Sequence, residues 1–242
     1  MRAPLHFLPS PLPFPSNVGL RHWQDSANVD DVTAERALYI ATSNPGKLRD
    51  FTAAAQTRGV EIRPLPGFDT LGSVEEDGLT FEHNAAKKAQ QYSLALPGEI
   101  VLADDSGLEV EALAGAPGVI SARYAAMEDP PVAFSGSADA ANNARLLREL
   151  AEVAGDRREA RFVCVIVAAR DGKALHVARG EARGQILRVA RGSGGFGYDP
   201  LFLYPPLGKT FAELRPEEKA EVSHRGQAFR KVLQWMREAG LG

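Results

Sequence analysis

Cysteine is almost absent from this chain of 242 residues, which contains only Cys164. An intrachain disulfide and a cysteine metal cluster are therefore impossible. Cys164 stands inside the apolar stretch 162–167, which predicts a small buried residue and fits a reducing cytoplasm. The five histidines show no spacing typical of zinc ligands, so zinc chemistry is disfavoured as well.

Excess charge and long apolar runs are also missing. The formal net charge of -3 at pH 7 gives no general attraction to nucleic acid or anionic membranes, so a polyanionic ligand would need locally placed lysines and arginines. No run approaches the roughly 18 to 20 apolar residues of a membrane-spanning helix. The chain also lacks the Gly-x-Ser-x-Gly signature of serine hydrolases and the spacing of a Walker A loop.

What is present divides the chain into two parts. The first 36 residues are rich in proline, and the prolines between Leu8 and Pro15 interrupt any apolar core of a signal peptide. We expect residues 1–36 to be a disordered extension or an over-long start, with a short docking segment as the alternative. Residues 37–242 read as one globular domain, since 44% of the chain is hydrophobic.

The apolar pattern of residues 37–242 alternates between strands and helices. It predicts strands at 37–41, 60–62, 99–103, 159–169 and 174–190, and helices at about 48–58, 81–96, 139–152 and in the C-terminal tail. Thr80 is expected to cap the second helix, and Asp171-Gly172 between two extended runs favours a hairpin. Strand, polar loop, helix and strand in succession predict a mixed α/β domain.

Two acidic segments could carry chemistry. Asp104 and Asp105 follow a predicted strand, where adjacent side chains point to opposite faces, so only one carboxylate can face a given site. Ser106 and Gly107 would permit a tight turn there. Glu76 lies in a second acidic segment, 75–78, and magnesium typically takes one or two carboxylates together with substrate phosphates. Taken singly, each segment is more typical of a solvated turn.

Basic and aromatic residues offer matching sites for a nucleotide. Lys47 follows a turn at an expected helix N-terminus, where free amides and the helix dipole favour phosphate. The glycine-rich loop 192–197 would let a ligand approach the backbone, and Phe196 offers a stacking face for a flat base. His224 and Arg225 could bond a base edge, or could merely begin the last helix.

Seven motifs together resemble the inosine/xanthosine triphosphate pyrophosphatase family, and the resemblance covers about residues 37–240. In order, they are Thr42-Ser43-Asn44-Pro45-Gly46-Lys47, Glu76-Asp77-Gly78-Leu79-Thr80-Phe81, Ala103-Asp104-Asp105-Ser106-Gly107-Leu108, Gly115-Ala116-Pro117-Gly118, Ser121-Ala122-Arg123-Tyr124, Gly194-Gly195-Phe196-Gly197-Tyr198-Asp199-Pro200 and Ser223-His224-Arg225-Gly226.

The resemblance implies an enzyme that hydrolyses ITP, dITP and XTP to the monophosphate and pyrophosphate and so cleanses the nucleotide pool. It implies Mg2+ as cofactor, a homodimer, and an elongated α/β fold with a mixed sheet, flanking helices and two lobes around a central cleft. By position, Glu76 and Asp105 match the metal ligands, and Asp105 also matches the general base. The matching substrate-binding set is Thr42, Ser43, Asn44, Pro45, Gly46, Lys47, Lys88, Ser106, Phe196, Gly197, Tyr198, Asp199, Lys219, His224 and Arg225.

The chemistry expected of these residues is simple. Asp105, with an ordinary pKa of about 4, would be ionised at neutral pH without any shift of that pKa by its surroundings. Donors such as His224 and Arg225 could select a 6-keto purine, because a 6-amino group would leave them unpaired. A pyrimidine or modified-nucleotide pyrophosphatase of the Maf type is the alternative enzyme, and a nucleotide-binding module without catalysis is the alternative class.

The chain departs from the family pattern at His83, where the family usually has glutamate. With Thr80 as the cap, position 83 is the third helical residue, so glutamate there would complete a capping box that His83 cannot. We interpret the change as a lost cap worth about 1 kcal/mol. The segment 130–138 is longer than the pattern, and the N-terminal extension is additional; neither touches a matched motif.

Overall fold

The computed structural model describes residues 37–130, 135–154 and 157–241. The extension predicted for residues 1–36 lies outside the described residues, as does part of the long segment 130–138. None of the helices within the described ranges combines the length and the apolar character that crossing a membrane requires.

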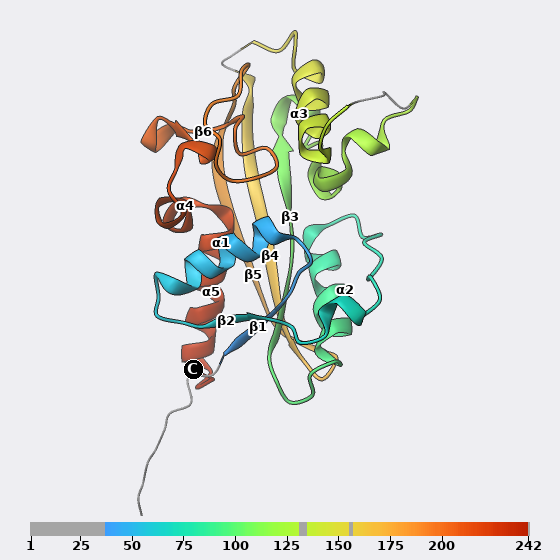
Figure 1. Cartoon of the computed structure of the whole chain (residues 1–242), viewed down its shortest axis with the longest axis vertical. Coiled ribbons are helices and arrows are strands. Elements are labelled where there is room, and N and C mark those ends of the chain that lie inside the picture. The colour runs from blue at the N-terminus through green and yellow to red at the C-terminus, as the bar shows by residue number, and fades with distance from the viewer. Residues whose placement is uncertain (1–36, 131–134, 155–156, 242) are drawn as a thin grey trace, which may run out of the picture. The chain divides into compact units, whose positions relative to one another are not determined.

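The described part of the chain is built on a seven-stranded mixed sheet with the order β2-β1-β3-β4-β5-β6-β7 (Figure 1). Its strands are β1 (Leu38–Ala41), β2 (Ile62–Pro64), β3 (Val101–Val110), β4 (Glu159–Arg170), β5 (Lys173–Ile186), β6 (Phe202–Tyr204) and β7 (Lys209–Thr210). Strand β1 runs parallel to both of its neighbours, and all other pairs are antiparallel.

The predicted hairpin is confirmed as the central pair β4 and β5. Asp171 and Gly172, at its tip, have φ angles of 50° and 77°, the left-handed values that a two-residue type I′ turn requires. Strand β5 ends at Ile186, four residues short of the predicted limit, because the chain leaves the sheet there.

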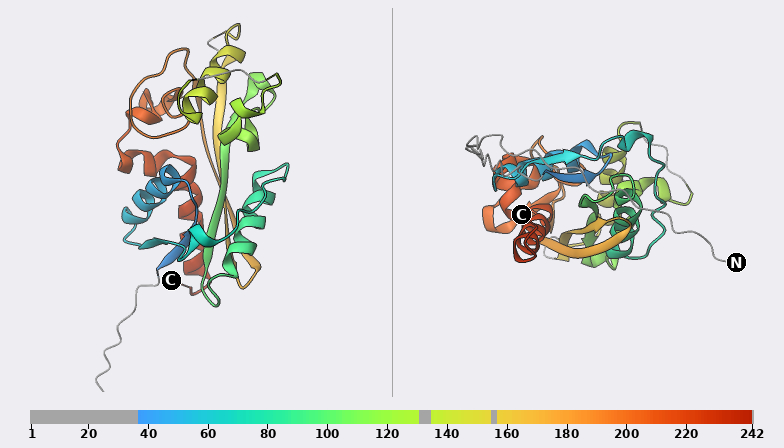
Figure 2. Two further views of the ribbon diagram at one scale, coloured as in Figure 1. Left: turned by 45° about the vertical axis from the view of Figure 1, so that its right-hand side comes forward. Right: turned by 90° about the horizontal axis from the view of Figure 1, so that it is seen from below.

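Helices cover both faces of the sheet (Figure 2). On one face, α1 (Pro45–Gln56), α4 (Pro216–Val222) and α5 (His224–Glu238) share an apolar core with β1, β3, β4 and β5. On the other, α2 (Phe81–Ser93) packs on β1, β3 and β4 through a second core. A third core joins α3 (Ala138–Glu149) to the far ends of β3 to β6. The predicted mixed α/β fold with flanking helices is confirmed.

Local chemistry explains where these helices begin. Four of the five are preceded by a residue whose side-chain oxygen accepts a backbone N–H of the first turn, as N-caps do: Asn44 for α1, Thr80 for α2, Ser137 for α3 and Ser223 for α5. Burial follows the apolar pattern, since the predicted apolar face of α5 is buried and Cys164 has no exposed surface. The predicted cap at Thr80 is thereby confirmed.

Strand β3 differs from the prediction. The sequence predicts a strand that ends at Ala103 and a tight turn at Ser106 and Gly107, but β3 continues straight through both residues, paired with β4. Gly107 is required for close packing: a Cβ there would lie 2.4 Å from the carbonyl oxygen of Gly118 and 2.4 Å from Ser121 Oγ. The glycine therefore admits a neighbouring loop and does not turn the chain.

Candidate active site

Two adjoining cavities collect most of the predicted site residues. The first, the acidic chamber, has a volume of about 270 Å3, and its lining includes Thr42, Ser43, Glu76, Lys88, Asp104 and Asp105. The second, the aromatic chamber, has a volume of about 70 Å3, and its lining includes Phe162, Phe196, Gly197, Tyr198, Asp199 and Arg225. Asn44, Lys47, Ser106 and Ala122 line both. Pro45, Gly46, Lys219 and His224 line neither.

The acidic chamber brings Glu76 and Asp105 to one ammonium group. Lys88 Nζ lies 3.0 Å from Glu76 Oε2 and 3.5 Å from Asp105 Oδ1. Lys88 projects from α2 and Asp105 from β3, whereas Glu76 lies in the loop before α2. Residues that are distant in sequence therefore place two carboxylates around one cation.

Asn84 is a site residue that the sequence analysis missed. It is fully buried on α2, and its Nδ2 donates to Asp105 Oδ2 at 3.1 Å and to the carbonyl of Gly78 at 3.3 Å. Its Oδ1 accepts from the amide of Gly78 at 2.8 Å. One side chain thus ties the loop of Glu76 to the strand of Asp105. Asn84 precedes Lys88 by four residues on the same helix face, but nothing in the sequence indicates that its side chain is buried against Asp105.

Asp104 and Asp105 face opposite sides of β3, as the sequence predicts. Asp104 is 3% exposed and pairs with Lys47 Nζ at 2.9 Å. Ser106, two residues on and so on the same face, donates its hydroxyl to Asp104 Oδ2 at 3.0 Å and accepts from Arg225 at 2.9 Å. Asp104 therefore holds Lys47 and Ser106 on one face of the strand. Asp105 contacts Lys88 and Asn84 on the other face.

Burial makes the carboxyl group of Asp105 a weaker acid than usual. Loss of solvent, added to repulsion by Glu76, raises its pKa to about 6 against the attraction of Lys88 and Lys47. The expectation of an ordinary pKa near about 4 is therefore wrong, although the group is still mostly ionised at pH 7. Burial would also raise the pKa of Asp104, but Lys47 and other cations outweigh it and hold that pKa below its usual value. A carboxylate with a pKa close to neutrality suits proton transfer.

The start of α1 is less open than the sequence predicts. Asn44 Oδ1 accepts from the amides of Gly46 and Lys47 at 2.8 and 3.0 Å, so two of the free amides expected for phosphate are already bonded. Gly46 instead allows close packing, because a Cβ there would lie 2.5 Å from Phe196 Cδ1. Lys47, which lines both chambers, is the positively charged group that this segment offers.

In the aromatic chamber, Phe196 is held between cations and a buried acid. Lys219 Nζ and the Arg225 guanidinium lie 5.2 and 4.9 Å from its ring centre, within range of a cation–π contact. The Phe196 amide donates to Asp199 Oδ2 at 2.9 Å, and the same oxygen lies 2.6 Å from Lys219 Nζ. Lys219 therefore supports the wall of the chamber from behind. Tyr198, which is buried, donates its hydroxyl to the carbonyl of Ser121 at 2.9 Å and bridges the chamber.

His224 lies deeper than the sequence predicts. It is fully buried, stacked 4.7 Å from Phe162 and 6.4 Å from Phe211, and neither ring nitrogen has a hydrogen-bond partner among the described residues. Burial, reinforced by Arg225, holds its pKa well below the usual value, so the ring is neutral. Phe162 lines the chamber in front of it, and Arg225, itself buried, is the member of the pair that lines the chamber.

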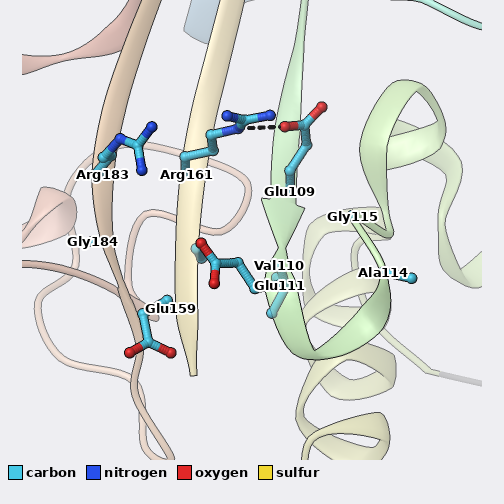
Figure 3. Close-up of a pocket in the computed structure, with 10 residues that line it drawn as sticks. Glu109, Val110, Glu111, Ala114, Gly115, Glu159, Arg161, Arg183 and Gly184 are labelled. Carbon is cyan, nitrogen blue, oxygen red and sulfur yellow. Dashed lines mark hydrogen bonds and ion pairs between the residues drawn. The ribbon is translucent and has the colours of Figure 1, made fainter. Parts of the chain in front are cut away.

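A separate cavity of about 440 Å3 lies at the far ends of β3, β4 and β5 (Figure 3). Its lining mixes acids and arginines, and Arg161 Nε is bonded to Glu109 Oε2 at 2.5 Å. None of the predicted site residues lines it.

Comparison with known proteins decides the family. The model of the Ham1 family matches residues 38–235. The chain belongs to the Ham1 family. A relative from Acidobacterium capsulatum described as a dITP/XTP pyrophosphatase is 50% identical to this Ham1-family chain over 196 residues, covering 81% of the chain and 96% of the relative. A dITP/XTP pyrophosphatase from Exiguobacterium sibiricum is 48% identical, with 81% and 94% covered.

Solved structures of the Ham1 family share the fold. The Ham1 protein of Staphylococcus aureus matches with a TM-score of 0.68 and 37% identity, covering 84% of this chain and 99% of that one. A nucleoside-triphosphatase, or dITP/XTP pyrophosphatase, of Mycobacterium abscessus matches with a TM-score of 0.59 and 38% identity, covering 81% and 98%. The family that the seven motifs predict is therefore confirmed.

Proposed function

We propose that this chain is a nucleoside triphosphate pyrophosphatase that hydrolyses ITP, dITP and XTP to the monophosphate and pyrophosphate. The family supports the enzyme class, since relatives about half identical along nearly their whole length are dITP/XTP pyrophosphatases. The observation that carries the proposal is the joining of an acidic chamber, which suits phosphates and a cation, to an aromatic chamber, which suits a flat base, through Lys47 and Ser106.

The donor set of the acidic chamber fits Mg2+. Glu76 and Asp105 offer oxygen ligands only, as hard cations prefer, and both already share the positive charge of Lys88. The described residues contain no cluster of three or more acidic, histidine or cysteine ligands, so substrate phosphates would complete the shell. In this proposal Glu76 and Asp105 hold the ion, which when bound would neutralise charge on the leaving pyrophosphate.

The residues of this chain would divide the remaining work. Asp105 accepts a proton from the water that attacks the α-phosphorus, and the bond to pyrophosphate breaks as the new P–O bond forms. Lys47 and Lys88 bind the triphosphate together with the hydroxyls of Thr42 and Ser43. The structure of the chamber supports this division, because Asp105 is held in place by Asn84 before substrate arrives.

Base selection belongs to the aromatic chamber. Phe196 stacks on the purine, and Arg225, with His224 behind Phe162, disfavours a 6-amino group that cannot accept a hydrogen bond. Asp199, Tyr198 and Lys219 keep Phe196 and its loop in position, as their bonds indicate. We include in the same proposal a homodimer acting on the nucleotide pool of the cytoplasm, and sedimentation of the purified chain would test the dimer.

Pyrophosphate release from ITP, XTP, dITP, GTP, ATP, UTP and dTTP with Mg2+ tests the proposal. We expect turnover of the first three to exceed that of ATP by at least about a hundredfold, the discrimination that a missing hydrogen-bond partner provides. Turnover of GTP should also be lower, but there the group to be disfavoured is the 2-amino group, since GTP shares the 6-keto group of ITP. Comparable turnover of GTP and ITP would overturn the proposed specificity. Preference for UTP or dTTP would favour the alternative pyrimidine enzyme.

A further inference from the structure

One helix outside the predicted site, α3, holds the loop that carries Phe196. The backbone amide of Gly197 donates to Asp139 Oδ2 at 2.8 Å, and its carbonyl accepts from Asn143 Nδ2 at 3.0 Å. Asp139 and Asn143 are four residues apart on α3 and so share one face of the helix. Both polar groups of one residue are therefore bonded to the same helix.

Gly197 needs such support because its backbone conformation is special. Its φ is +60°, in the left-handed region that glycine adopts freely, so the residue has little local preference to keep it there. Phe196 precedes it directly, and a shift of the Gly197 peptide would move the aromatic ring. Asp199 bonds the other side of the loop through the Phe196 amide, which leaves α3 as the support on the Gly197 side.

The same helix also holds the facing wall. Asn142, 4% exposed, accepts from the amide of Ala125 at 2.7 Å and donates to the carbonyl of Ala122 at 3.1 Å. Ala122 lines both chambers, and Asn142 lines the aromatic one. Two consecutive asparagines of α3 thus reach the two walls of the aromatic chamber, so the helix sets where both walls lie.

The three residues Asp139, Asn143 and Gly197 do not line the acidic chamber at the phosphate end of the cleft. Asp139 and Asn142 line the aromatic chamber, and no residue of α3 is among the residues that line the acidic chamber. We call the two bonds from Asp139 and Asn143 to Gly197 the clamp. Loss of the clamp should therefore weaken binding of the base and leave the phosphate and metal contacts intact.

We propose that Asp139 and Asn143 are positioning residues, which hold Gly197 so that the ring of Phe196 is in place before the purine binds. The inference rests on the proposed function and extends it to residues that contact no reacting atom. A loop that is already ordered binds its ligand more tightly, because no conformational entropy of the loop is lost on binding.

Steady-state kinetics with dITP and Mg2+ test the clamp. Asp139→Ala removes the acceptor, and the isosteric Asn143→Asp removes the donor; each should raise KM about fivefold, the effect of one hydrogen bond, with kcat changed by less than about twofold. Asp139→Asn, which keeps an acceptor oxygen, should recover most of the loss. Arg148→Ala, an exposed change on the same helix, serves as the control for damage to α3.

Two further readouts separate positioning from general destabilisation. The Gly197 amide should exchange with solvent faster in Asp139→Ala than in the wild type. Inorganic tripolyphosphate, which has no base, should inhibit the variants and the wild type with the same constant. An unchanged KM in both variants would overturn the inference, as would an equal loss of tripolyphosphate binding.

Failure of the proposed function would look different. A wild-type chain that releases no pyrophosphate from dITP or XTP would refute that function. The clamp would then be tested by calorimetry, which measures binding of inosine monophosphate. The same fivefold weakening in Asp139→Ala is expected there, and equal binding by variant and wild type would refute the clamp.

Discussion

Replacing Asp105 by asparagine should abolish turnover and at the same time stabilise the metal-free protein. The carboxylate is 4% exposed, and burial raises its pKa from 3.8 to about 6, which means that the folded chain holds the charged form at a cost. At 1.36 kcal/mol per pH unit, this cost is about 3 kcal/mol. Asparagine keeps an oxygen for Asn84 and carries no charge.

The net gain is smaller than this figure. The pKa of about 6 already includes the attraction of Lys88, but asparagine has a single side-chain oxygen, so it cannot keep both the bond from Asn84 and the bond that Asp105 Oδ1 accepts from the Ser106 amide at 3.1 Å. We expect the free energy of unfolding to rise by about 1 to 2 kcal/mol at pH 7, or several degrees in Tm for a domain of this size. Turnover should fall by about a thousandfold, since the general base is removed.

The pH dependence of this stabilisation tests the direction of the electrostatic effect. A carboxyl whose pKa is raised by folding costs nothing below its unfolded pKa, and its cost grows as pH rises through the folded value. The difference in unfolding free energy between Asp105→Asn and the wild type should therefore grow from pH 3.8 to about 6 and then stay constant.

Urea unfolding in EDTA across that pH range measures the stability difference, and pyrophosphate release with Mg2+ measures turnover. Mg2+ should raise the Tm of the wild type and leave that of the variant nearly unchanged, because the ion would lose one of its two carboxylates. A variant less stable than the wild type at pH 7 in EDTA would refute the electrostatic reasoning. Near-normal turnover would refute the role of Asp105.

Three further predictions concern the neighbourhood of this carboxylate. Asn84→Ala removes three hydrogen bonds to Asp105 and the Gly78 peptide; it should lower kcat at least about tenfold and destabilise by about 2 kcal/mol or more, measured by kinetics and urea unfolding. His83→Glu should complete the capping box with Thr80 and raise Tm by a few degrees in calorimetry, with unchanged kcat. Gly107→Ala should destabilise by about 1 to 3 kcal/mol, since its methyl group has no room; a variant as stable as the wild type would contradict the close packing.

Most of the fold could be predicted from local patterns. Apolar periodicity located β1 to β5 and helices α1, α2, α3 and α5, but not the short elements β6, β7 and α4. The cap at Thr80 and the turn at Asp171-Gly172 depend on neighbours within four residues. The prediction failed at Gly107, which was interpreted as part of a turn. A glycine in a turn and a glycine that admits a distant loop have the same local sequence, and only the approach of that loop distinguishes them.

The candidate site shows the same division. Strand alternation alone predicted that Asp104 and Asp105 serve different faces, and the structure confirms it. The acidity of Asp105, the burial of His224 and the positions of Asn84 depend on residues far away in the chain, so no local pattern could indicate them.

By itself, the sequence determined the longer strands and helices, the cap at Thr80 and the family that the ordered motifs resemble, because these depend on short-range geometry and on the order of residues. The tertiary structure alone decided that Glu76, Lys88 and Asp105 meet, that Asn84 links their segments, and that α3 reaches Gly197. Desolvation and hydrogen bonding between distant segments exist only after packing, and they set both the acidity of the carboxylate and the position of the aromatic wall.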